Sequence, residues 1–294
     1  MQGPPVDGLL LAELSEQLAA EGAGSSVVPK AGEGRVIVGE GIISAGKSYL
    51  IGKLVDLANS EGGDWFAIFE RPDPKLLDLF YDHLDERPRN SYAFASQVSF
   101  LQSRILSNLQ AQALAGKRNE YGNQCSPSKV VFTDRSMIGD GVFAIANRLL
   151  DGILPEEYEA YRSIRSSHRP LTQDVTLFLD VTPQRAKVLL AKRDNPYERN
   201  VPVWYLALLR RVYLRVLRDL ALSGKARIAL MRNEPFVTPE QALRAIERAP
   251  SVSATSQLWG TVDVDCASDE SVHDEFERLH GLYLEREKAI AESG

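Results

Sequence analysis

A glycine-rich segment near the N-terminus constrains the fold of this chain more than any other feature. The β-branched run at 36–38 leads into Gly41-Ile42-Ile43-Ser44-Ala45-Gly46-Lys47-Ser48, which has the spacing Gly-x-x-x-x-Gly-Lys-Ser. A helical pattern follows, because apolar residues recur on one side between 50 and 58. A strand, a glycine loop and a helix in this order form the context that a phosphate-binding P-loop requires. The sequence therefore predicts a binding site for a nucleoside triphosphate.

The residue types of this segment suit the binding of phosphate groups. Gly41 and Gly46 allow the backbone to turn so that its N–H groups point inward at an anion. A helix that begins at Lys47 adds the positive end of its dipole. We expect Lys47 to reach the β- and γ-phosphates of the nucleotide and the Ser48 hydroxyl to bind Mg²⁺.

The composition is that of an ordinary globular protein and argues against several other classes. The 294 residues are 44% hydrophobic and 25% charged, and this length permits one large domain or two. The net charge of −6 argues against a general nucleic-acid-binding protein. No apolar run approaches the length of a membrane span. The first lysine is Lys30, so we expect no signal peptide.

Cysteine and histidine do not indicate a disulfide framework or a metal centre. Cys125 and Cys266 are the only cysteines, which fits a reducing, cytoplasmic compartment. The four histidines lack metal-ligand spacing with either cysteine. We therefore expect a cytoplasmic protein that binds neither nucleic acid nor a membrane.

Strands and helices alternate after residue 33. Apolar runs predict strands at 36–38, 65–69, 130–133, 174–180, 226–230 and 261–265, and a helix at 271–291 closes the chain. This alternation is typical of a parallel sheet covered by helices on both faces. Residues 1–33 hold one short helical pattern and a stretch rich in glycine and serine. We interpret them as an N-terminal extension that is partly flexible.

Polar side chains follow the second and third strands directly. Glu70 comes after one strand, and Asp134-Arg135-Ser136 comes at the end of the next. In a parallel sheet, residues just beyond the strand ends line the ligand crevice. Glu70 is placed to act as a general base, although an ordinary charged residue leaving a strand would look the same. The Asp-Arg-Ser group suits phosphate and magnesium chemistry better than a simple polar helix cap.

Two helical regions carry further polar residues of interest. Gln97 and Arg104 lie two turns apart on a predicted helix at 91–115 and so point the same way. Both side chains can hydrogen-bond in two places, which suits reading a nucleobase edge, although two solvated helix residues would give the same pattern. The basic segment 192–199 predicts a lid over the triphosphate in preference to a solvated loop.

In this order the motifs resemble those of the deoxyribonucleoside kinase family, whose members move the γ-phosphate of ATP onto a nucleoside 5′-hydroxyl. The resemblance covers about residues 35–222, with a weaker echo at 261–280. It implies a P-loop kinase fold with a five-stranded parallel sheet flanked by helices on both faces. We expect one such domain at 34–294, with an insertion near 223–260.

The resemblance implies roles in phosphoryl transfer for the residues of these motifs. Glu70 is similar to the family's general base, and Arg135 to the residue that holds the 5′-hydroxyl and stabilises the transferring phosphoryl group. Asp134 resembles a carboxylate on the magnesium side, with Ser48 as the direct ligand. The ATP-binding set implied is the loop 41–48 together with two lid arginines, Arg193 and Arg199.

The resemblance also implies which residues bind the acceptor. Tyr81 and Glu198 resemble the pair that hydrogen-bonds the sugar 3′-hydroxyl, and Gln97 resembles the reader of the base. Arg104 and Asp140 match a pair that accompanies recognition of cytosine or purine bases. Phe143 lies one residue away from the position of the family's second aromatic residue. A homodimer built on long helices is implied too, with 91–115 and 141–167 as candidates.

The sequence thus predicts a cytoplasmic deoxynucleoside kinase that uses ATP and Mg²⁺, with a deoxypurine or deoxycytidine favoured as substrate. One alternative is a nucleoside-monophosphate kinase close to thymidylate kinases. That enzyme needs an extra cation for the acceptor phosphate, and Arg71 could supply it. The other alternative is a regulatory subunit that binds nucleotide without catalysis. The presence of Lys47, Ser48, Glu70 and Arg135 argues against a degenerate site.

Overall fold

The fold is built on five parallel strands in the order β2-β3-β1-β4-β5. The computed structural model describes residues 4–21, 34–82, 84, 92–116, 129–168, 173–259 and 285. The strands are β1 (Arg35–Glu40), β2 (Trp65–Ile68), β3 (Val130–Asp134), β4 (Val175–Asp180) and β5 (Ile228–Arg232). The expected five-stranded parallel sheet is therefore confirmed. The strand expected at 261–265 lies outside the described residues, as does the helix expected at 271–291 except for residue 285, which is helical.

The central strands are buried because their sequences are almost continuously apolar. β1, β3 and β4 have nearly every residue buried, as expected for parallel strands covered on both faces. β2 and β5 lie at the two edges and are more exposed. Since all pairs are parallel, the carboxyl ends of the strands meet at one edge of the sheet.

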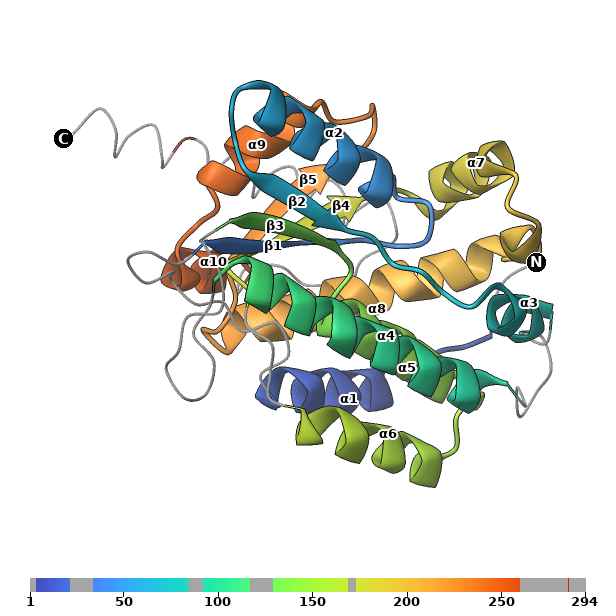
Figure 1. The fold of residues 1–294 in the computed structure, drawn as a ribbon. Helices are drawn as coiled ribbons and strands as arrows, with labels where there is room; N and C mark the ends of the chain where they lie inside the picture. Colours follow the sequence, from blue (N-terminus) through green and yellow to red (C-terminus); the bar gives the residue numbers. More distant parts are fainter. Residues whose placement is uncertain are drawn as a thin grey trace.

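Helices cover both faces of the sheet (Figure 1). On one face lie α2 (Lys47–Ser60) and α9 (Pro239–Glu247). The other face carries α1 (Gly8–Ala20), α4 (Ala93–Leu114), α5 (Met137–Leu149), α6 (Pro155–Ser167) and α8 (Val203–Leu222). The remaining helices are α3 (Pro74–Asp82), α7 (Pro183–Arg193), the 3₁₀ turn η1 (Pro196–Glu198) and α10 (Val252–Trp259). No helix among the described residues is long and apolar enough to cross a membrane.

Helix α1 belongs to the hydrophobic core, which differs from the partly flexible extension expected for residues 1–33. Leu11, Leu14 and Leu18 are buried, and the helix packs against α8 and α5. Glu21, just after the helix, forms ion pairs of 2.8 Å with Arg162 and 2.6 Å with Arg165 on α6. The sequence pattern showed the helix but not the surface that buries it. Residues 22–33 lie outside the described part.

Several predicted boundaries shift in the structure. The strand expected at 226–230 is β5, two residues further on, and it is part of the main sheet. Residues 257–259 are helical, as the end of α10. The candidate dimer region 141–167 is two helices, α5 and α6. These differences concern the ends of strands and helices and the loops between them, where tertiary contacts outweigh the local sequence pattern.

Candidate active site at the carboxyl ends of the strands

The glycine loop has the geometry that its sequence predicts. Gly41 and Gly46 adopt φ values of 147° and 88°, which favour glycine, and α2 begins at Lys47. A Cβ atom at Gly41 would lie 2.6 Å from the carbonyl oxygen of Leu179, so the loop also approaches β4 too closely for a side chain. The Lys47 ammonium donates hydrogen bonds to the carbonyls of Gly41 at 3.3 Å and Ile42 at 3.1 Å.

Lys47 is buried beside other charged groups, and this changes its proton affinity. Burial, followed by the nearby charge of Arg135, lowers the pKa of the Lys47 amine to about 8. The carboxylates of Asp134 and Glu70 act in the opposite direction. The amine is therefore still charged at neutral pH, but it would lose its charge in mildly alkaline solution.

A cavity of about 630 Å³ opens beside the loop. This volume is in the range that accommodates a nucleotide-sized ligand. It is lined by P-loop residues 44–48, by Tyr49 and Lys53 of α2, by Arg193 and by the segment from Phe236 to Pro239 after β5. Arg199 is not among the lining residues and instead pairs with Asp194 at 2.8 Å, with both side chains exposed. The structure therefore brings only one of the two expected lid arginines to the cavity.

The segment after β5 contributes residues that the sequence analysis did not identify. Asn233 donates a 2.7 Å hydrogen bond to the carbonyl of Ala45 and accepts one of 2.8 Å from the backbone of Val237. The Arg185 guanidinium lies over the ring of Phe236, 5.2 Å from its centroid. These contacts place an aromatic ring and a guanidinium beside the loop. No sequence motif marks them, because Asn233 and Ala45 are 188 residues apart.

Ser48 and Asp134 meet at the end of the loop, as the sequence predicts for the magnesium side. The Ser48 hydroxyl donates a hydrogen bond to Oδ2 of Asp134. The other carboxylate oxygen, Oδ1, is buried and has no hydrogen-bond partner within the described part of the chain. No group of three or more histidine, cysteine or acidic side chains in that part could hold a metal ion by itself. A hydroxyl and a single carboxylate fit Mg²⁺, which keeps several ligands from water and substrate phosphates.

Glu70 is held between two arginines. It lies two residues beyond β2 and accepts a 2.6 Å bond from Nη2 of Arg104 and a 3.1 Å bond from Nε of Arg135. Burial by itself would raise the pKa of Glu70, but the charges of Arg104 and Arg135 outweigh it and hold the pKa below the ordinary value. The carboxylate is thus ionised at neutral pH.

Arg135 connects Glu70 to the glycine loop. Its Nη1 donates hydrogen bonds to the carbonyl of Gly41 at 3.0 Å and to the hydroxyl of Tyr213 at 2.7 Å. Its backbone has φ of 74°, an uncommon conformation for a residue with a side chain. Phe143 lies beneath the guanidinium, 4.9 Å away, and is also 5.8 Å from that of Arg104. Phe143 therefore contacts both arginines.

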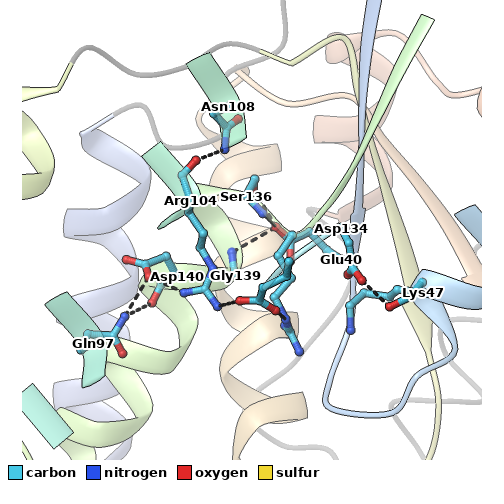
Figure 2. A network of polar contacts seen from close by, with 12 residues as sticks. Glu40, Lys47, Gln97, Arg104, Asn108, Asp134, Ser136, Gly139 and Asp140 are labelled. Atoms are coloured by element: carbon cyan, nitrogen blue, oxygen red, sulfur yellow. Dashed lines mark hydrogen bonds and ion pairs between the residues drawn. The ribbon is translucent and has the colours of Figure 1, made fainter. Parts of the chain in front are cut away.

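Asp140 accepts hydrogen bonds from the side chains expected to read the nucleobase (Figure 2). Its Oδ1 accepts hydrogen bonds from Gln97 at 3.0 Å and from Arg104, and its Oδ2 accepts one from the Tyr161 hydroxyl. Burial raises the pKa of Asp140 even though Arg104 and Tyr161 oppose it. The two-turn spacing of Gln97 and Arg104 thus brings both to one carboxylate. Tyr161, on α6, was not identified from the sequence.

Tyr81 and Glu198 lie on neighbouring elements, α3 and η1, which contact each other. Burial raises the pKa of Tyr81, and the charge of Glu198 is among the further causes. Glu198 accepts a 3.0 Å hydrogen bond from Asn195 and forms a 3.3 Å ion pair with Arg193. The Tyr205 hydroxyl is buried and has no partner among the described residues. Its ring lies 6.5 Å from that of Tyr81.

A parallel sheet with a glycine loop after β1, and with polar groups gathered at the strand ends, defines a nucleotide-binding protein of the P-loop kinase class. The comparisons with known proteins narrow this class. The family model described as deoxynucleoside kinase matches residues 37–248, which is most of the chain. The chain therefore belongs to the deoxynucleoside kinase family. The match includes β5 and α9, which the sequence analysis placed in an insertion near 223–260.

Similar proteins of known name are kinases of purine deoxynucleosides. A deoxyguanosine kinase of Dictyostelium discoideum is 33% identical over 201 residues, which are 67% of this chain and 63% of that protein. This alignment thus spans less than two thirds of the relative's length. A deoxyadenosine kinase of the same organism is 26% identical over 232 residues, or 76% of this chain and 82% of its own length.

Solved structures share the fold. A deoxyadenosine kinase from M. mycoides with bound dATP superimposes with a TM-score of 0.54 at 17% identity, covering 73% of this chain and 98% of that one. The same kinase with the products dCMP and a flexible dCDP gives a TM-score of 0.53 at 19% identity, with coverages of 72% and 95%. At this identity the likeness concerns the fold alone.

Proposed function

We propose that this protein transfers the γ-phosphate of ATP to the 5′-hydroxyl of a deoxyribonucleoside and so forms the monophosphate. One observation carries the proposal: Glu70 is clamped by Arg104 and Arg135, and Arg135 also donates to the Gly41 carbonyl of the P-loop. Arg135 thereby connects Glu70, on the acceptor side, with the P-loop that would bind the phosphate donor. Phosphoryl transfer depends mainly on such positioning and charge neutralisation.

The donor side of the site suits a nucleoside triphosphate. The cavity beside the loop would take ATP, with Lys47 near the phosphates and Phe236 and Arg185 beside the purine. Arg193 lines the same cavity and could pair with a phosphate. Ser48 and Oδ1 of Asp134 would hold Mg²⁺, which when bound would neutralise charge on the donor phosphates.

The acceptor side suits activation of a hydroxyl. The ionised Glu70 would accept a hydrogen bond from the 5′-hydroxyl and take its proton as the bond to phosphorus forms. Arg135 would stabilise the transferring phosphoryl group. Tyr81 and Glu198 would bind the sugar 3′-hydroxyl. The Tyr205 hydroxyl, which has no partner among the described residues, supports a polar ligand at this place.

A deoxypurine or deoxycytidine is the favoured acceptor. Gln97 and Arg104 meet on Asp140, so an amide, a guanidinium and a carboxylate face one small region. This set can both donate to and accept from a base edge. The relatives named deoxyguanosine kinase and deoxyadenosine kinase support a purine.

We further propose a homodimer in the cytoplasm. Leu106 and Leu109 on α4 are 66% and 51% exposed, and Ile164 on α6 is 39% exposed. α4 and α6 contact each other, so these apolar side chains could belong to one surface. Their exposure fits a face that is covered by a second copy.

An acceptor panel tests the proposed function. The full-length chain would be incubated with ATP and Mg²⁺ and each of the four deoxynucleosides or their monophosphates, with products separated by charge. We expect deoxyadenosine, deoxyguanosine or deoxycytidine to gain one phosphate. Transfer to monophosphates alone would favour a nucleoside-monophosphate kinase. Binding of ATP without any transfer would favour a regulatory subunit.

A further inference from the structure

Glu40 is a fully buried carboxylate that neither the motifs nor the proposed mechanism uses. It is the last residue of β1 and directly precedes Gly41, the first glycine of the P-loop. A carboxylate that is 0% exposed in the centre of a parallel sheet is unusual, because taking it out of water is unfavourable. Burial accordingly raises the pKa of Glu40. An apolar residue at this position would avoid that cost. The presence of a carboxylate therefore indicates that its contacts have a role.

One oxygen of Glu40 holds the start of α5. Oε1 accepts hydrogen bonds from the backbone N–H of Ser136 at 2.8 Å, from the Ser136 hydroxyl at 2.6 Å and from the N–H of Gly139 at 3.1 Å. Figure 2 shows these groups converging beside the P-loop. The N–H groups at a helix start favour a negative charge. Arg135 immediately precedes this helix start, so its backbone is fixed on one side by the same contacts.

The other oxygen reaches Arg135 through a tyrosine. Oε2 of Glu40 accepts a 2.9 Å hydrogen bond from the hydroxyl of Tyr213, which lies on α8 and is itself fully buried. The oxygen of the same hydroxyl accepts a 2.7 Å bond from Nη1 of Arg135. The three groups form a chain in which the guanidinium donates to the tyrosine and the tyrosine donates to the carboxylate. Arginine can only donate, so the tyrosine oxygen accepts from Arg135 and the tyrosine proton is directed to the carboxylate.

The junction is packed too closely to be incidental. A Cβ atom at Gly139 would lie 2.6 Å from Oε2 of Glu40 and 2.8 Å from the Tyr213 hydroxyl. The elements β1, α5 and α8 thus meet at two oxygen atoms, Oε2 of Glu40 and the hydroxyl of Tyr213. Arg135 needs such support because its φ of 74° is strained for a residue with a side chain.

We propose that Glu40 and Tyr213 are positioning residues that hold the Arg135 guanidinium in place between the P-loop and Glu70. The inference rests on the proposed role of Arg135 in phosphoryl transfer. It adds two residues, one before the loop and one on α8, that act on the reaction only through Arg135. Tyr213 sets the direction of Nη1, and Glu40 sets the direction of the Tyr213 hydroxyl.

Steady-state kinetics of Tyr213→Phe test the proposal. We expect kcat to fall about 10-fold, as for the loss of one good hydrogen bond in the transition state, while the KM for ATP stays the same. Glu40→Gln should have a similar effect, because its amide N–H would face the tyrosine hydroxyl as a donor in place of the carboxylate oxygen that accepts from it. Tyr158→Phe is the matched control, since Tyr158 is buried on α6, which is not one of the three elements that meet at the junction, and should keep wild-type kinetics.

A double-mutant cycle separates positioning of Arg135 from a general structural effect. In an Arg135→Lys background, Tyr213→Phe should lower kcat no further, because the lysine lacks the Nη1 group that the tyrosine directs. An equal loss in both backgrounds would overturn the proposal, as would a wild-type kcat for Tyr213→Phe. Thermal unfolding of each variant would check that it is folded.

Nitrogen-15 NMR of the arginine side chains gives a readout that does not depend on the acceptor. The Arg135 signals would be assigned by their loss in Arg135→Lys. We expect restricted rotation and slow hydrogen exchange of the Arg135 guanidinium in the wild type, and faster rotation and exchange in Tyr213→Phe. Unchanged dynamics in Tyr213→Phe would contradict the proposal. If the wild type phosphorylates no deoxynucleoside, the proposed function fails and this measurement alone decides the inference.

Discussion

At the scale of single residues, the site holds two carboxylates that bind the same arginine and whose pKa values shift in opposite directions. Arg104 bonds to both Glu70 and Asp140. Glu70 also contacts Arg135, and the two cations keep its pKa low despite burial. Burial dominates at Asp140 and raises its pKa. As the pH falls, protonation of Asp140 should therefore contribute to the acid loss of activity by weakening nucleoside binding.

Tyr161→Phe should move that loss to higher pH. Asp140 faces Gln97 and Arg104 from α4 and Tyr161 and Arg165 from α6. Removing the Tyr161 hydroxyl takes away a bond that favours the charged form, so the pKa of Asp140 rises further. The pH below which the KM for the deoxynucleoside increases should then rise, while kcat at pH 8 stays near wild type. An unchanged KM–pH profile, identical to that of the Tyr158→Phe control, would contradict this role.

Lys47 gives an alkaline limit on nucleotide binding. Because burial and Arg135 lower its pKa to about 8, the free protein loses this charge as the pH rises through that value. Binding of ATP must then return a proton to the amine, so affinity should fall about tenfold for each pH unit well above 8. Calorimetry at pH 7 and 9 in buffers of different ionisation enthalpy would show weaker binding with proton uptake at pH 9. Equal affinity without proton uptake would refute the assignment.

Glu40 predicts how stability depends on pH. Its pKa is raised in the folded state above the value of 4.5 expected for the unfolded chain, so the folded state binds more protons in between. Stability should therefore decline as the pH rises from about 4.5 through the folded-state pKa. Glu40→Gln cannot titrate at this position, so the difference in unfolding free energy between wild type and variant isolates the effect. A wild type that gains stability relative to Glu40→Gln over this range would show the opposite sign.

At the scale of secondary-structure elements, α1 packs against α5, the helix that carries Asp140, and stabilises it. Leu18 is 3% exposed and lies against Gly141 on α5, where a Cβ atom would be 2.6 Å from its Cδ1. Leu18→Ala should lower the free energy of unfolding by about 2–5 kcal/mol. Leu9→Ala on the same helix is the matched control, because Leu9 is 85% exposed and should change stability by less than about 0.5 kcal/mol. Equal effects in urea denaturation would argue that α1 does not pack as described.

At the scale of the whole molecule, the sequence allowed us to predict those features that depend on a local pattern of residues. The P-loop could be located because its glycines, lysine and helix start are contiguous, and Gln97 and Arg104 could be paired because one helix sets their spacing. Glu40 and Tyr213 could not be paired, since 173 residues separate them and nothing local marks either one. The same holds for Tyr161 against Asp140 and for Asn233 against Ala45. The burial of α1 likewise depends on α5 and α8, which come much later in the chain.

Transfer kinetics of Glu70→Gln test most directly whether the clamped carboxylate activates a nucleoside hydroxyl. The variant keeps the shape of the side chain and removes its charge, and Glu61→Gln, at an exposed position after α2, is the control. With the best deoxynucleoside of the panel, we expect kcat to fall about 10²–10⁴-fold while the affinity for ATP is retained. A Glu70→Gln protein that turns over as fast as the wild type would contradict the proposed chemistry.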